Sequence, residues 1–130
     1  MTMKSVSSEK PFKFTIPRSR WLRGYDDSAL LDSAGNQCCV GHYLSAVGVP
    51  REKLLCRTTA NTLVSEYELP DAAKWLVAYL PISRRHESED ASELYELNDT
   101  SSGDGFTAKE RERRIKEIFA KHDIRVQFTK

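Results

Sequence analysis

The run Asp32-Ser33-Ala34-Gly35-Asn36 constrains the fold most, because it gathers turn-forming residues between two short apolar segments. Such a cluster is typical of a β-hairpin, in which the central residues of the turn adopt positive φ. Either Gly35 or Asn36 can supply that conformation. The sequence therefore predicts a hairpin with strands near 29–32 and 37–40.

A helix is predicted directly after this hairpin. From Cys39 to Val47 apolar residues recur at helical spacing. Gly48 and then Pro50 follow, which is the order expected just past the C-terminal end of a helix. Gly41 lies in the first turn, where the absence of a Cβ would allow another segment of backbone to approach closely.

Two further strands are predicted towards the ends of the sequence. Residues 12–16 and 124–128 alternate apolar and polar side chains, as a half-buried strand does. The pattern allows these two strands to lie side by side. With helices between them, the fold class is α+β: a single domain over 12–130, preceded by a flexible tail over 1–11. Its small sheet is expected to be mixed or antiparallel and covered by about four helices.

The later part of the chain supplies most of those helices. An apolar run predicts a helix over 71–80, and a shorter one is expected over 91–97. The clearest signal follows, because Thr107 and Glu110 have the S/T-x-x-E spacing of a capping box. Apolar residues at helical spacing continue from there towards the last strand.

Composition narrows the class of protein. The chain has 130 residues, 39% of them hydrophobic and 30% charged, with a formal net charge of +1. No apolar run approaches the roughly 20 residues of a membrane-spanning helix, and no secretory signal is visible. Three cysteines without an export signal are expected to remain reduced. These features predict a cytoplasmic protein with no membrane partner.

A cysteine- or zinc-dependent activity is one alternative. Cys38 and His42 are four residues apart and would share a helix face, but a zinc site usually has a second closely spaced ligand pair. The remaining candidates for such a site, or for a cysteine nucleophile and its base, are Cys39, Cys56, His86 and His122. The structural interpretation is preferred: Cys38 and Cys39 are expected to be buried beneath the helix.

Nucleic-acid binding is a second alternative, because basic residues cluster in two segments. The first is Lys10, Lys13, Arg18, Arg20 and Arg23, and the second is Lys109, Arg111, Arg113, Arg114, Lys116 and Lys121. If both clusters met on one face, phosphate binding would follow. The residues chosen for that site are Arg20, Arg23, Arg113 and Arg114. Against it, acidic residues interrupt the second cluster and the net charge is near zero.

No established catalytic motif is present. The chain has no glycine-rich phosphate loop, no Gly-x-Ser-x-Gly elbow and no His-Glu-x-x-His pair. We therefore expect no catalytic residues, no metal and no cofactor, and we favour a binding protein over an enzyme.

A set of short motifs resembles small uncharacterised proteins encoded by tailed phages and prophages. The motifs are Trp21-Leu22-Arg23-Gly24, Gly35-Asn36-Gln37-Cys38-Cys39-Val40-Gly41 and Asn98-Asp99, followed by a closing helix and strand. Val40 stands where leucine is commoner in those proteins. The resemblance implies an accessory phage-type origin and assigns no activity to any residue.

These observations together favour non-enzymatic binding to a host or viral protein. An inhibitor of a host defence system is one such role for a phage-type accessory protein. The site of action would then be the cytoplasm of the host cell.

Overall fold

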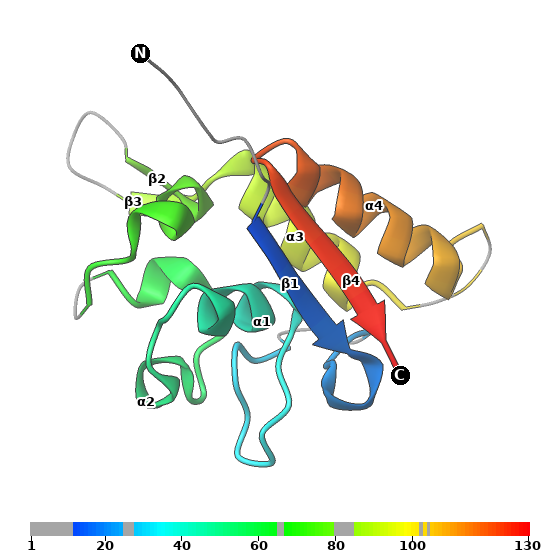
Figure 1. The fold of residues 1–130 in the computed structure, drawn as a ribbon, viewed down its shortest axis with the longest axis horizontal. Helices are drawn as coiled ribbons and strands as arrows, with labels where there is room; N and C mark the ends of the chain where they lie inside the picture. The colour runs from blue at the N-terminus through cyan, green and yellow to red at the C-terminus, as the bar shows by residue number, and fades with distance from the viewer. Residues whose placement is uncertain (1–11, 25–27, 65–66, 80–84, 102, 104) are drawn as a thin grey trace.

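Strands from opposite ends of the sequence form the central sheet of the computed structural model (Figure 1). β1 (Phe12–Pro17) and β4 (Ile124–Thr129) pair in parallel, as the alternating patterns at 12–16 and 124–128 allowed. The structure describes residues 12–24, 28–64, 67–79, 85–101, 103 and 105–130. The predicted tail over 1–11 lies outside the described residues.

Only one face of this sheet is buried. Helices α1 (Cys39–Ala46), α3 (Glu89–Asp99) and α4 (Ala108–Ala120) lie on that face, with α3 packed against both of the others (Figure 1). The buried side chains are Phe14, Ile16, Ile124, Val126 and Phe128. Those on the solvent face are Lys13, Thr15, Arg125 and Gln127. The α+β class is confirmed.

A second sheet replaces part of a predicted helix. The helix expected over 71–80 is wrong: a 3-10 helix, Asp71–Leu76, gives way to strand β2 (Val77–Tyr79). β2 pairs antiparallel with β3 (Arg85–Glu87), a segment in which no strand was predicted. A continuous apolar run fits a buried helix and a buried strand equally, so the pairing partner decides between them. Residues 80–84 lie outside the described residues.

The turn predicted at Asp32–Asn36 is confirmed. The amide of Asp32 donates to the carbonyl of Asn36 (2.9 Å), and Gly35 has φ +89°. The carboxylate of Asp32 also accepts from the amides of Ala34 (2.9 Å) and Asn36 (2.8 Å). This Asx-type loop satisfies the backbone of the turn locally.

The strands predicted on either side of that turn, near 29–32 and 37–40, are not formed. Only isolated bridges occur there, and they lead in different directions: Leu31 pairs with Leu55, whereas Gln37 pairs with Trp21. The described strands therefore form two separate two-stranded sheets, and not one sheet with a hairpin at its centre. Tertiary partners have overridden the local pairing that the turn suggested.

Helix α1 begins where the sequence predicted. Cys38 is its N-cap, and the Sγ atom accepts from the amide of Gly41 (3.4 Å). The close approach predicted at Gly41 is confirmed, since a Cβ there would stand 2.0 Å from the carbonyl oxygen of Leu30. Gly48 has φ +102° just after the helix, as its predicted position requires.

The remaining helices are short or capped as expected. α2 (Arg51–Leu54) is a single turn, and 3-10 turns occur at Arg18–Arg20 and Ala60–Thr62. The capping of α4 is confirmed, with the Thr107 hydroxyl accepting from the Glu110 amide (3.1 Å). Within the described ranges, no helix is both long and apolar enough to cross a membrane.

We predict that Gly41→Ala lowers the free energy of unfolding by about 3 kcal/mol, because the added methyl group must displace backbone rather than a flexible side chain. Chemical denaturation of the purified variant measures the loss. Gly103→Ala is the matched control, since nothing lies within 4 Å of its Cβ position. Equal effects of the two substitutions would contradict the packing described at Gly41.

Candidate functional site

An open groove of about 830 Å³ runs along the edge of β1 that faces away from β4. The strand forms one wall, and the turn at Gly35 together with the ends of α1 and α2 forms the other. The lining residues are Phe12, Lys13, Phe14, Thr15, Pro17, Arg20, Gly35, Gln37, His42, Ser45, Ala46 and Arg51. We call this hollow the β1 groove. Its volume is within the range of about 300–1,000 Å³ typical of ligand sites.

Two arginines converge over the turn at one end of the β1 groove. A Cβ on Gly35 would stand 3.3 Å from Nη1 of Arg20 and 3.7 Å from Nη2 of Arg51, so both guanidinium groups lie over the same small residue. Both side chains are exposed, and neither forms an ion pair with any described residue. Lys13 adds a third exposed cation beside the strand. The two arginines make their end of the groove positively charged, although Asp32 and Glu52 border the adjoining hollow that they also line.

Two buried residues hold the backbone of Arg20 in place. Its carbonyl accepts from the amide of Gln37 (3.0 Å) and lies 3.1 Å from Nε2 of the buried His42. Burial lowers the pKa of His42, which favours the neutral ring. A carbonyl oxygen only accepts, so the proton is on Nε2. In this position His42 supports the Arg20 turn instead of acting as a base for a thiol.

The predicted arginines of α4 are already paired. Arg113 contacts Glu110 (2.5 Å) and Glu117 (2.6 Å), and Arg114 contacts Glu110 (3.0 Å). These pairs lower the pKa of Glu110. Phosphate binding here would compete with three ion pairs of the helix itself, so Arg113 and Arg114 are weaker candidates than their sequence cluster suggested.

Other basic residues near 18–23 are also used within the fold. Arg23 lies over the ring of Trp21 at 4.5 Å and donates to the carbonyls of Arg18 and Trp21 (3.1 Å each). Arg18 forms a bidentate pair with Glu112 (both 2.7 Å), which joins the end of β1 to α4. The two basic segments therefore do meet, but through an ion pair in which Glu112 compensates the charge of Arg18. Of the four predicted nucleic-acid residues, only Arg20 has no ion pair or structural hydrogen bond from its side chain among the described residues.

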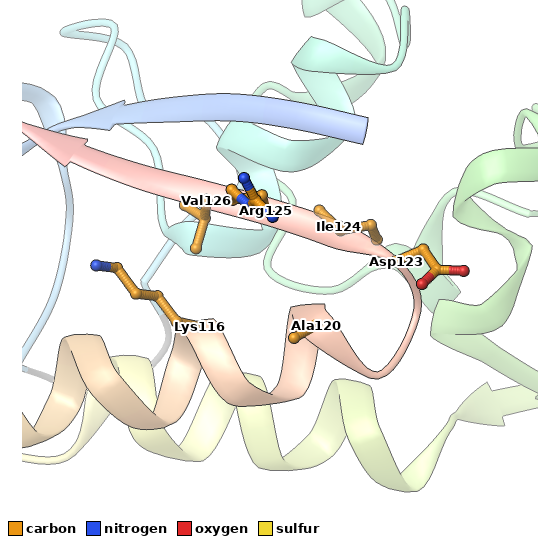
Figure 2. Close-up of a pocket in the computed structure, with 6 residues that line it drawn as sticks. All are labelled: Lys116, Ala120, Asp123, Ile124, Arg125 and Val126. Atoms are coloured by element: carbon orange, nitrogen blue, oxygen red, sulfur yellow. The ribbon is translucent and has the colours of Figure 1, made fainter. Parts of the chain in front are cut away.

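A second, smaller hollow lies between α4 and β4 (Figure 2). Its volume is about 310 Å³, and both a lysine from the helix and an arginine from the strand border it. The lining residues are Lys116, Ala120, Asp123, Ile124, Arg125 and Val126. It carries its own carboxylate, which makes it a poorer site for an anion.

The paired cysteines are structural. Cys38 and Cys39 are 1% and 0% exposed, which confirms their predicted burial. Burial raises the pKa of Cys38 to about 12 and that of Cys39 well above its ordinary value. A helix N-terminus normally favours the thiolate, but here desolvation dominates. Cys56 differs, because it is exposed and has φ +62°.

No converging group of three His, Cys, Asp or Glu side chains able to hold a metal is found among the described residues. The side chain of His86, one of the proposed ligands, lies outside the described part of the chain.

The motif residues converge on one buried amide. Oδ1 of Asn98 accepts from the indole Nε1 of Trp21 (2.8 Å) and from the amide of Cys39 (3.0 Å). Its Nδ2 donates to the carbonyl of Leu22 (2.9 Å), and the backbone carbonyl of Asn98 accepts from the amide of Gly24 (2.8 Å). We call this set the Asn98 hub. The Trp-x-Arg-Gly, Cys-Cys and Asn-Asp motifs thus meet in the core, away from the β1 groove.

No family model, curated protein or solved structure matches this chain. The residues of the β1 groove are therefore the basis for a functional assignment. The sequence identified Arg20 but not Arg51, which follows Pro50 and comes near Arg20 only through the fold.

We predict that only Cys56 reacts rapidly with a thiol-modifying reagent in the native protein, since it is the exposed cysteine. Cys38 and Cys39 should react at least about a hundredfold more slowly, because the fold must open first. Mass spectrometry of the alkylated protein identifies the sites. Cys56→Ser should abolish the fast reaction, and rapid labelling of Cys38 or Cys39 would contradict their structural role.

We also predict that Asn98→Ala lowers the free energy of unfolding by about 2–4 kcal/mol, because buried donors of Trp21 and Cys39 lose their acceptor. Urea denaturation measures this difference. The control is Asn61→Ala: the partly exposed side-chain carboxamide of Asn61 makes no hydrogen bond with a described residue, and its backbone N–H still donates to Glu87 (2.9 Å) in the variant, so the effect should stay within about 0.5 kcal/mol. A similar small effect at Asn98 would show that the hub is dispensable.

Proposed function

We propose that this protein acts by non-enzymatic binding to an acidic surface of a partner protein, through the β1 groove. The observation that carries the proposal is the uncompensated pair Arg20 and Arg51, placed over Gly35 beside an open strand edge. Arg113 and Arg114 of α4, by contrast, are paired with carboxylates of the same helix. Charge left unpaired in a hollow is available to a partner and steers its approach.

The motif resemblance supports a phage- or prophage-type accessory role. On this proposal the partner is a host or viral protein, and inhibition of a host defence protein in the host cytoplasm is the specific role. Trp21, Cys39 and Asn98 of the motifs form the Asn98 hub, whereas Gly35 and Gln37 of the same motifs line the groove. The resemblance therefore bears on the origin of the protein, and the charges of the groove bear on the partner.

The two alternatives have less support in the geometry. A thiol-dependent reaction at Cys38 or Cys39 is disfavoured, because burial raises the pKa of both side chains and so suppresses the thiolate. Nucleic-acid binding through Arg23, Arg113 and Arg114 requires breaking contacts that those side chains make within the fold. A polyanion bound at Arg20 and Arg51 alone would contact few phosphates and bind with a shallow salt dependence.

We predict that the double substitution Arg20→Glu/Arg51→Glu reduces recovery of the specific partner at least about tenfold, because like charges then face its acidic surface. The measurement is quantitative affinity capture from nuclease-treated host lysate, with thermal melting to confirm that the variant is folded.

The matched control is Arg113→Glu/Arg114→Glu, which changes the net charge equally but alters residues that are already paired. Its recovery should stay near that of the unmodified protein. Equal loss in both variants would indicate a general charge effect and overturn the assignment to the groove. If material is captured from untreated lysate but none from nuclease-treated lysate, the nucleic-acid alternative is favoured.

A further inference from the structure

The backbone of β1 presents unused hydrogen-bonding groups to the groove. In a parallel pair, a residue whose N–H and C=O face the partner strand is followed by one whose groups point away. The amide of Phe12 donates to the carbonyl of Asp123 (3.0 Å), which fixes that alternation. The N–H and C=O groups of Lys13 and Thr15 therefore point away from β4 and towards the β1 groove.

These outward groups have no partner in the described part of the chain. No backbone or side-chain hydrogen bond to the amide or carbonyl of Lys13 or Thr15 is formed on that side. The groove beside them is lined by β1 from Phe12 to Pro17, so it follows the strand along its length. An exposed strand edge of this kind is a template for an added strand.

The side chains along the groove differ from one end to the other. At the C-terminal end of β1 stand the unpaired cations Arg20 and Arg51. At the N-terminal end, Phe12 is 40% exposed, although the other residues of the strand on this face are buried. Lys13 lies near this apolar end. The groove thus offers acid-binding groups at one end and an apolar contact at the other.

We infer that the β1 groove takes an extended acidic segment of the partner, which pairs with β1 as a third strand of the sheet. Acidic side chains of that segment lie against Arg20 and Arg51, and an apolar side chain lies against Phe12. This inference rests on the proposed function and specifies how the partner is held. Main-chain hydrogen bonds supply affinity and the two ends of the groove supply specificity.

The outer edge of β4 is the weaker candidate for such pairing. The hollow beside it is smaller, about 310 Å³, and Lys116 of α4 borders it, with its Nζ 5.9 Å from the ring centroid of Phe128 (Figure 2). Asp123 borders that hollow and would repel an acidic segment. The β1 edge has the larger groove and no carboxylate among its lining residues.

The same observations favour a peptide over a nucleic acid. Alternating N–H and C=O groups match the backbone of another strand, whereas a phosphate chain only accepts hydrogen bonds. The carbonyls of Lys13 and Thr15 would face phosphate oxygens and remain unpaired, which carries a cost where the bound molecule excludes water. A peptide satisfies both kinds of group at once.

The probe is an eight-residue peptide of alternating threonine and glutamate with capped ends. Nuclear magnetic resonance of the ¹⁵N-labelled protein should show shifted and exchange-protected amides at Lys13 and Thr15 when the peptide is added. A matched peptide of threonine and lysine should bind at least about tenfold more weakly, because its charge is reversed.

Backbone pairing is tested separately from charge. The threonine–glutamate peptide is N-methylated at every second residue, in both possible frames. Methyl groups in one frame face β1 and should weaken binding about tenfold, while those in the other face away and should be tolerated. In the protein, Thr15→Pro removes an outward donor and should weaken binding similarly, whereas Thr15→Val keeps the N–H and should not. The N-methylated peptides decide the matter if Thr15→Pro is unfolded.

The outcomes separate this inference from the proposed function. If both N-methylated peptides bind like the parent, or Lys13 and Thr15 show no amide protection, strand pairing is wrong. The proposed function then still stands if Arg20→Glu/Arg51→Glu loses the partner. If a twelve-nucleotide oligothymidylate binds more tightly than the peptide at equal salt and depends on the same arginines, both the inference and the proposed function fall.

Discussion

One buried amide holds together the parts of this fold that lie far apart in the sequence. Asn98 accepts from the indole of Trp21 and from the first amide of α1, and its Nδ2 donates to the carbonyl of Leu22. Its side chain is fully buried, so the loss of either acceptor or donor leaves groups that water cannot reach. The segment that these bonds fix continues back to Arg20, so the position of the groove depends on the core.

The elements that were predictable are those whose signals are local. Alternation identified β1 and β4, the threonine cap identified the start of α4, and Gly41 marked a close approach in α1. The strands beside the turn at Asp32–Asn36, and the identity of Val77–Tyr79, depended instead on partners elsewhere. A turn can form while its flanking residues pair with other segments, and no local pattern shows that.

The charged residues also divide into those that local sequence signals reveal and those that depend on distant partners. Arg20 was identifiable because it stands in a basic segment, and the pairing of Arg113 and Arg114 with Glu110 follows from helical spacing. The bond between Arg18 and Glu112, however, joins positions 94 residues apart. Neither the pairing of Arg18 with Glu112 nor the approach of Arg20 to Arg51 leaves a trace in the sequence. Counting charges along the sequence therefore overestimates the free positive charge on α4 and misses Arg51 in the β1 groove.

The parallel pairing of β1 with β4 has a consequence for how the protein is made. Phe12 cannot find its partner until Ile124 has been synthesised, so loop closure over nearly the whole chain precedes formation of the sheet. Helices α1, α3 and α4 can form earlier, with the apolar face of β1 still uncovered. Folding speed is accordingly limited by topology, even though most helices are local.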